Sequence, residues 1–70
     1  MTQEYIREYP SQKIIGIIET YENGDQIARD YTTRKILGYY KAGLNITTDD
    51  LHRTIAKGNC VVSFIYKINR

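Results

Sequence analysis

The chain has few of the residues that carry most protein chemistry. Its 70 residues include one cysteine, one histidine, one proline, one phenylalanine and no tryptophan. A lone cysteine excludes a disulfide within the chain, and one histidine beside one cysteine is too few for a structural zinc site. No glycine-rich phosphate-binding loop and no motif of paired catalytic carboxylates occurs. We therefore predict a protein that is not an enzyme and that holds no cofactor and no metal.

Long hydrophobic runs are also missing. The longest apolar stretches cover 14–18 and 61–65, far fewer residues than the roughly 20 that a membrane-spanning helix needs. Glu4, Arg7 and Glu8 lie near the start, and the apolar segment of a secretory signal does not follow them. We therefore expect a soluble, cytoplasmic protein with no membrane partner.

The length predicts a single small domain, residues 1–70, in which 1–10 form an edge strand or an arm. A domain of this size buries only about 60% of the surface of its unfolded chain. Small domains usually gain stability from disulfides, a metal or oligomerisation. Because the first two are excluded, we predict self-association. The net charge of +2 is spread among acidic residues, so it permits nucleic-acid binding without requiring it.

One motif occurs three times along the chain. It consists of an acidic residue, a turn-like stretch that ends in a basic or amide residue, then an apolar pair that a glycine usually follows. The central copy covers 30–40, and the outer copies, 8–18 and 49–59, are displaced from it by 22 and 19 positions. A repeated pattern predicts a repeated structure, here about three units of roughly 20 residues.

Local patterns predict short antiparallel strands joined by tight turns. We expect strands at 13–21, 25–31, 34–41 and 60–68, all rich in β-branched or aromatic residues. Asn23-Gly24 predicts a type I′ hairpin turn, in which both residues have positive φ. Gly16 and Gly38 mark either a close approach of backbone or a bulge that bends the sheet.

The first of these strands is apolar on both faces at its centre. Ile14 and Ile18 are expected on one face, with Gly16 between them, and Ile15 and Ile17 on the other. A single small sheet leaves one face in water. We therefore expect a second sheet or a second subunit to cover the other face.

Residues 47–58 fit two structures. An N-cap threonine, two acids in the first turn and a lysine before a closing glycine are typical of a helix over 48–57. The repeat instead predicts strand–turn–strand, with Asp49 and Arg53 in the places of Asp30 and Arg34. We prefer an all-β fold of short antiparallel hairpins, which oligomerise or close into a small sheet or barrel. The alternative is an α+β fold with a helix at 48–57.

The motif resembles one in small bacterial β-hairpin-repeat proteins of the fourfold β-flower type, in which acid-x-x-Gly-Arg-Ile-x-Gly recurs. The likeness covers 8–59, and its closest residues are Asp30, Arg34, Ile36, Leu37 and Gly38. Thr33 and His52 stand where that family has a glycine before the arginine. The resemblance implies an all-β fold built of hairpins, and it implies no catalytic residues.

Two single residues are candidates for chemistry. His52 would act as a base only beside a nucleophile, and no serine or cysteine lies near it in sequence. Cys60 follows Lys57, which would favour a reactive thiolate, although free cysteine is commonly a small buried hydrophobe. We predict an ordinary turn histidine and a structural cysteine. We also predict ion pairs across two turns, Asp30 with Arg34 and Asp49 with Arg53.

Seven tyrosines are the most distinctive feature of the composition. Six residues form the candidate binding set: Tyr39, Tyr40, Lys41, Arg29, Arg34 and Arg53. Bases stack on such rings while cations neutralise phosphate, but tyrosine is equally suited to protein interfaces or to filling half-buried strands. We predict a small non-catalytic interaction or structural module that acts as a homo-oligomer, with a phage or other mobile element as one setting. The alternative is nucleic-acid or nucleotide binding.

Overall fold

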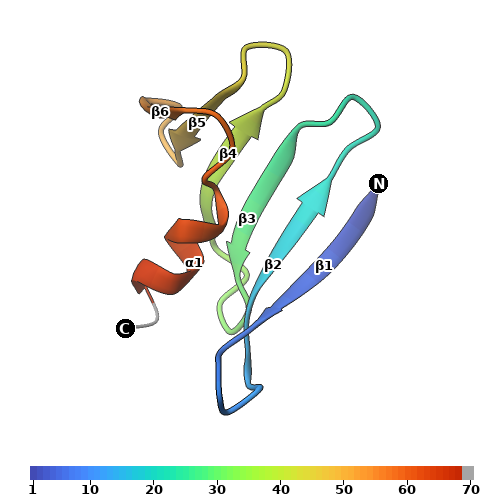
Figure 1. Ribbon diagram of the computed structural model, residues 1–70, viewed down its shortest axis with the longest axis vertical. Coiled ribbons are helices and arrows are strands. Elements are labelled where there is room, and N and C mark those ends of the chain that lie inside the picture. Colours follow the sequence, from blue (N-terminus) through green and yellow to red (C-terminus); the bar gives the residue numbers. More distant parts are fainter. Residues whose placement is uncertain (69–70) are drawn as a thin grey trace.

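In the computed structural model, which describes residues 1–68, six antiparallel strands form one open sheet and a short helix lies against it (Figure 1). The elements are β1 (Thr2–Arg7), β2 (Ile14–Thr20), β3 (Gln26–Asp30), β4 (Ile36–Lys41), β5 (Ile46–Asp49), β6 (Thr54–Lys57) and α1 (Val62–Ile68). The strands lie in chain order, so each pairs with the next through a hairpin. The predicted all-β fold is confirmed in part, because residues 1–68 form a mainly β structure of antiparallel strands in one open sheet, with one short helix added.

The contested segment consists of β5 and β6 joined by a turn. The prediction of strand–turn–strand is therefore confirmed, and the alternative helix at 48–57 is wrong. β1 is one edge of the sheet. For residues 1–10 the sequence left an edge strand and an arm open, and residues 2–7 form an edge strand. The other edge is β6.

The first two copies of the motif form the same hairpin loop. Its closing bonds run from Glu8 N to Lys13 O (2.8 Å) and from Asp30 N to Lys35 O (3.0 Å). The residue before each lysine has a left-handed backbone, with φ of 61° at Gln12 and 64° at Arg34. Because both loops reverse the chain in this way, the motif marks a turn with one left-handed residue.

The third copy is one residue shorter in its loop. Here Asp49 N donates to Arg53 O (3.0 Å), and the left-handed residue is His52, with φ of 64°. His52 therefore takes the structural place of Arg34, 18 positions later in the chain. The expectation that Arg53 takes that place is wrong, because similarity of residue type does not reveal that the loop is shorter.

A β-bulge follows each of these loops. The extra residue is Ile15 in β2, Leu37 in β4 and Ile55 in β6. A bulge shifts the alternation of side chains along its strand. Ile15 consequently joins Ile18 in the core, so the expectation that these two side chains face opposite sides is wrong.

Gly16 and Gly38 each follow a bulge and lie beneath α1. A Cβ on Gly16 would lie 2.5 Å from Cγ2 of Ile65, and a Cβ on Gly38 would lie 2.6 Å from Cε2 of Phe64. Real Cβ atoms essentially never come so close to another heavy atom. The two glycines therefore allow the helix to approach the backbone of the sheet directly.

The C-terminal segment predicted as a strand at 60–68 is helical, so that prediction is wrong. Its apolar residues also fit helical spacing, since Val61 and Ile65 are four positions apart and both are buried. Asn59 Oδ1 accepts a hydrogen bond from Val61 N (3.2 Å) where the helix begins. Burial of the apolar sheet face stabilises the helix despite the β propensity of its valines and isoleucines.

The turn between β2 and β3 is not of type I′. Tyr21 N donates to Asp25 O (2.9 Å), and this hydrogen bond encloses three residues, 22–24, where a type I′ turn has two. Gly24 has φ of 94°, but Asn23 has no positive φ, and its Oδ1 accepts a hydrogen bond from Asp25 N (3.0 Å). The type I′ prediction at Asn23-Gly24 is therefore wrong: the side chain of Asn23 stabilises a turn in which Gly24 alone is left-handed.

Gln12→Gly is expected to stabilise the protein by roughly 0.5–1 kcal/mol. A left-handed backbone costs an L-residue about 1–2 kcal/mol, part of which the greater freedom of glycine in the unfolded chain offsets. Lys13→Gly is the control, because Lys13 has no positive φ, and it should destabilise. Urea unfolding compares the two, and a Gln12→Gly protein less stable than wild type would contradict the argument.

Candidate interaction surface

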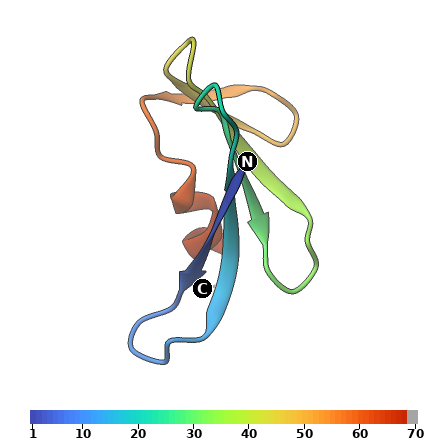
Figure 2. The same cartoon turned by 90° about the vertical axis from the view of Figure 1, so that its right-hand side faces the viewer.

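α1 covers one face of the sheet, and within residues 1–68 no helix or strand covers the other, which we call the open face (Figure 2). The side chains that strand register and alternation place on it include Gln3, Tyr5, Arg7, Ile14, Ile17, Glu19, Ile27, Arg29, Ile36 and Tyr39. Figure 2 shows the β3–β4 and β5–β6 loops bending toward this side, away from the helix. The sequence predicted a second sheet or a second subunit as the covering layer, whereas within residues 1–68 the covering element is the helix α1, and it covers one face only.

Aromatic rings lie in two groups along the open face. Tyr5 of β1 meets Tyr31 edge to face, with ring centroids 6.1 Å apart, and Cζ of Arg34 lies 4.8 Å from the Tyr31 centroid. Farther along, the Tyr39 and His52 rings stack with centroids 4.5 Å apart. Each of these two ring pairs joins residues from two different hairpins.

Polar side chains on the same face are already paired. Arg29 Nε lies 2.7 Å from Glu19 Oε1, and Gln3 Nε2 donates to Glu19 Oε2 (3.0 Å). The hydrogen bond from Arg29 holds the pKa of Glu19 below its usual range, against burial that raises it. Ile17, whose register partners are Tyr5 and Arg29, is only 2% exposed.

The β5–β6 loop contains the second ion pair. Arg53 Nε lies 2.7 Å from Asp49 Oδ2, as predicted. The pKa of Asp49 is lowered chiefly by the backbone N–H of Arg53, with its guanidinium and the N–H of Leu51 adding to the effect. Two of the predicted cationic site residues, Arg29 and Arg53, therefore each have a carboxylate as partner, which lessens their attraction for phosphate.

The structure divides the predicted binding set. Arg29 and Arg34 lie together, since Arg29 Nη1 donates to Arg34 O (3.1 Å). Tyr40 lies on the helix side, packed against the core, and its hydroxyl donates to Asn45 Oδ1 (2.7 Å). Tyr39 faces the opposite side, because consecutive residues of a strand alternate. Lys41 is the last residue of β4.

In the β3–β4 loop, the side chains of Asp30 and Arg34 make contacts other than the predicted ion pair. Asp30 Oδ2 accepts hydrogen bonds from the backbone N (2.9 Å) and Oγ1 (3.0 Å) of Thr33. Arg34 lies instead over the ring of Tyr31. The loop therefore uses its acid to hold the turn and its arginine to cover an aromatic ring.

His52 and Cys60 are the two remaining candidates for chemistry. His52 lies in a loop, stacked on Tyr39. Cys60 is half-buried just before α1, and its backbone N donates to Thr47 Oγ1 (3.0 Å). Across residues 1–68, no three histidine, cysteine, aspartate or glutamate side chains come together as metal ligands.

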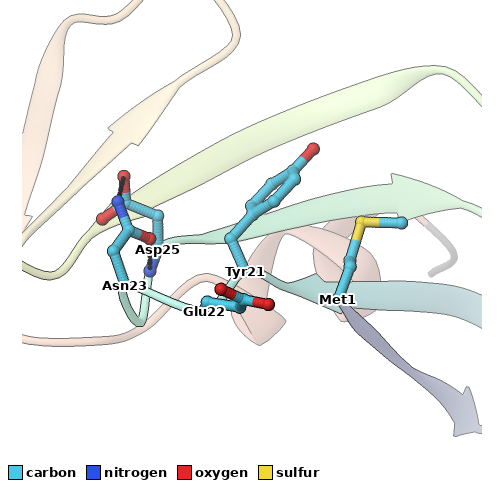
Figure 3. A pocket seen from close by; sticks show the side chains of 5 residues that line it. All are labelled: Met1, Tyr21, Glu22, Asn23 and Asp25. Carbon is cyan, nitrogen blue, oxygen red and sulfur yellow. Dashed lines mark hydrogen bonds between the residues drawn. The ribbon is translucent and has the colours of Figure 1, made fainter.

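A hollow of about 500 Å³ lies at the β2–β3 turn (Figure 3). It is lined by Met1, Tyr21, Glu22, Asn23 and Asp25. Figure 3 shows Asn23 and Asp25 turned toward each other, where Asn23 Nδ2 donates to Asp25 Oδ2 (3.3 Å). Asp25 Oδ1 also accepts from Ala42 N (2.8 Å). The carboxylate of Asp25 thus holds two turns together, and the hollow contains no serine, cysteine or histidine.

The two edges of the sheet differ, and sequence reasoning missed this difference. β1 has six residues, five of them exposed, and contains no proline, glycine or lysine. β6 has four residues, carries a bulge at Ile55 and ends at Lys57. Bulges, short length and lysine are common protections of an edge strand against pairing. β1 lacks all three of these protections. In the sequence, the alternation around Tyr5 was the signal that a strand lies here.

Comparison with known protein families, curated proteins and solved structures finds no match to this chain. The resemblance to β-flower proteins therefore stays a prediction. None of the helical segments within 1–68 has the length and apolar character to cross a membrane.

The Glu19–Arg29 pair predicts a pH-dependent stability. The folded-state pKa of Glu19 is depressed, so its contribution is present above the ordinary value near 4.3 and is lost as pH falls through the folded pKa. We expect Glu19→Gln to be less stable than wild type at pH 7, and the difference to shrink steadily as the pH falls below the ordinary pKa of glutamate. Urea unfolding at pH 7 and at a series of acidic pH values measures it, and a difference that stays the same throughout would contradict the assignment.

Proposed function

We propose that the protein is a small non-catalytic interaction module that binds a second copy of itself. The observation that carries this proposal is β1, a six-residue edge strand whose outer side is unpaired. Such a strand presents free backbone N–H and C=O groups to another chain. The small core supports it as well: Ile15, Ile18, Ala28, Val61 and Ile65 form the buried cluster. A core of this size gives a marginal stability that assembly increases.

Sedimentation velocity over a range from micromolar to submillimolar protein tests the proposal. We expect the sedimentation coefficient to rise with concentration, and the melting temperature to rise with it, because association stabilises the folded state by mass action. A chain that stays monomeric over the whole range, with a constant melting temperature, would contradict self-association.

Nucleic-acid or nucleotide binding is the second candidate, and the group of Tyr5, Tyr31 and Arg34 on the open face favours it. Bases stack on such rings, and the affinity would fall steeply with salt because phosphate contacts release counterions. Anisotropy of labelled single-stranded oligonucleotides at low and high salt tests it, with Arg34→Ala as the weakened variant. No binding at low salt would remove this candidate. The pairing of Arg29 and Arg53 with carboxylates makes it the weaker of the two.

A further inference from the structure

We infer that two copies pair antiparallel along β1, about a twofold axis at Tyr5, so that the two sheets become one continuous sheet. This inference rests on the proposed self-association and names its interface. The partner is a second copy of this chain. The residues of β1 determine both which edge of the sheet pairs and in which register it pairs.

The choice of edge follows from the contrast between β1 and β6. β1 is the longer strand, its register is interrupted by a bulge in its partner β2 and not in β1 itself, and it contains no lysine or proline. β6 contains the bulge residue Ile55 and ends at Lys57. An antiparallel partner therefore finds a longer and straighter row of backbone groups on β1.

The choice of register follows from symmetry and charge. A twofold axis perpendicular to the sheet keeps each face on its own side, so opposed residues must come from the same face. An axis at Glu4 would oppose Glu4 to itself, and an axis at Ile6 would oppose Glu4 to Glu8. An axis at Tyr5 opposes Gln3 to Arg7 and Glu4 to Ile6. Of these three central registers, only the last avoids placing like charges opposite each other.

The open face favours the same register. Tyr5 is 49% exposed in the single chain, yet its ring already rests edge-on against Tyr31. Opposed Tyr5 rings would bury one another, and a ring held in place loses less conformational entropy on binding. An interface built on six residues per copy is small, so we expect a reversible dimer with a roughly micromolar Kd.

Engineered cysteines test the register directly. In a Cys60→Ser background, Tyr5→Cys places the two substituted residues opposite each other. Their Cα atoms would lie about 4.5–5.5 Å apart, a distance that suits a disulfide. Glu4→Cys is the matched control, because the diagonal separation of about 8 Å is too long. Mild oxidation of the full chain should crosslink the Tyr5→Cys protein. An equal mixture of Gln3→Cys and Arg7→Cys proteins should form the mixed dimer.

Charge changes test the same contacts without crosslinking. Gln3→Arg keeps a partner in its own chain, since position 3 lies beside Glu19, but it opposes Arg7 of the second copy twice by symmetry. We expect the dimer Kd to rise about tenfold, from two like-charge pairs across the strands. Adding Arg7→Glu to this variant should return the Kd to within about twofold of wild type. Circular dichroism of dilute samples checks that each variant is folded.

The outcomes separate this inference from the proposed function. A wild-type chain that is monomeric throughout overturns both. A dimer whose Kd is unchanged by Gln3→Arg, and which neither Tyr5→Cys nor Glu4→Cys crosslinks, overturns only the β1 interface. A crosslink through Glu4→Cys but not through Tyr5→Cys keeps β1 as the interface and overturns the register at Tyr5. Crosslinking at Tyr5 together with the loss and recovery of affinity supports it.

Discussion

Gly38→Val is expected to destabilise the protein by about 3 kcal/mol, since overpacking a tight site typically costs 1–3 kcal/mol or more. A Cβ at this position would lie 2.7 Å from the backbone oxygen of Thr48 and 2.6 Å from Cε2 of Phe64. The Phe64 ring has some freedom to move. The Thr48 carbonyl has little, because it belongs to the β5 strand that pairs with β4. The clash is therefore relieved only by separating two strands or by lifting α1.

Thermal unfolding followed by circular dichroism measures this loss, which should lower the melting temperature by on the order of 15 °C in a chain of this size. Gly38→Ala and Gly43→Ala form a matched pair of controls. A Cβ on Gly43 would meet no atom within 4 Å, and Gly43 has no positive φ, so its change should stay within about 0.5 kcal/mol. If both alanine variants lost the same stability, close packing at Gly38 would not be the reason for its glycine.

The hairpins were predictable because their determinants are local. An acid, a turn and a left-handed residue lie within five or six positions in each copy of the motif, so the sequence alone shows where the chain reverses. The register of the third copy was not predictable in this way. Arg53 matches Arg34 in type, but backbone geometry assigns the equivalent place to His52. Loop length is a property of the backbone that residue similarity does not report.

The C-terminal helix depended on longer-range packing. Valine, isoleucine and phenylalanine in one run favour a strand by propensity, while Val61 and Ile65 at helical spacing favour a helix equally well. The choice between strand and helix depends on the bulged face of β2 and β4, where two glycines allow a helix to pack closely against the sheet. Gly16 and Gly38 indicated a close packing site in the sequence, but α1, the element that packs there, lies at the C-terminal end of the described residues.

The candidate surface was predictable only in part. Alternation along β4 already places Tyr39 and Tyr40 on opposite faces, so their separation follows from the strand assignment. The contact of Tyr5 with Tyr31 and Arg34 does not. It depends on how the β3–β4 loop bends toward the open face, and bulge positions and loop curvature set that bend. The local pattern thus predicts which face a side chain takes, but not its neighbours from other hairpins.

Ile65→Ala is expected to destabilise the protein by about 3 kcal/mol, within the 2–5 kcal/mol typical of such a change in a core. Ile65 is fully buried and joins Ile15, Ile18 and Ala28 in the central cluster. Val62→Ala, one turn away and 37% exposed, is the control and should cost well under about 1 kcal/mol. Urea unfolding at one protein concentration measures both, so that any association contributes equally.

Gly16→Ala tests whether Ile65 packs directly on Gly16. The three atoms that a Cβ on Gly16 would meet, Cγ2, Cδ1 and Cγ1 of Ile65, lie 2.5–2.8 Å away, and alanine at position 65 lacks all three. Gly16→Ala should therefore destabilise the wild-type chain but cost little in the Ile65→Ala background. We expect a coupling of at least about 1 kcal/mol in the double-mutant cycle, as for residues in direct contact. Additive losses would mean that the helix does not rest on the glycine, and the two glycines of the β2 and β4 bulges would then need an explanation within the sheet itself.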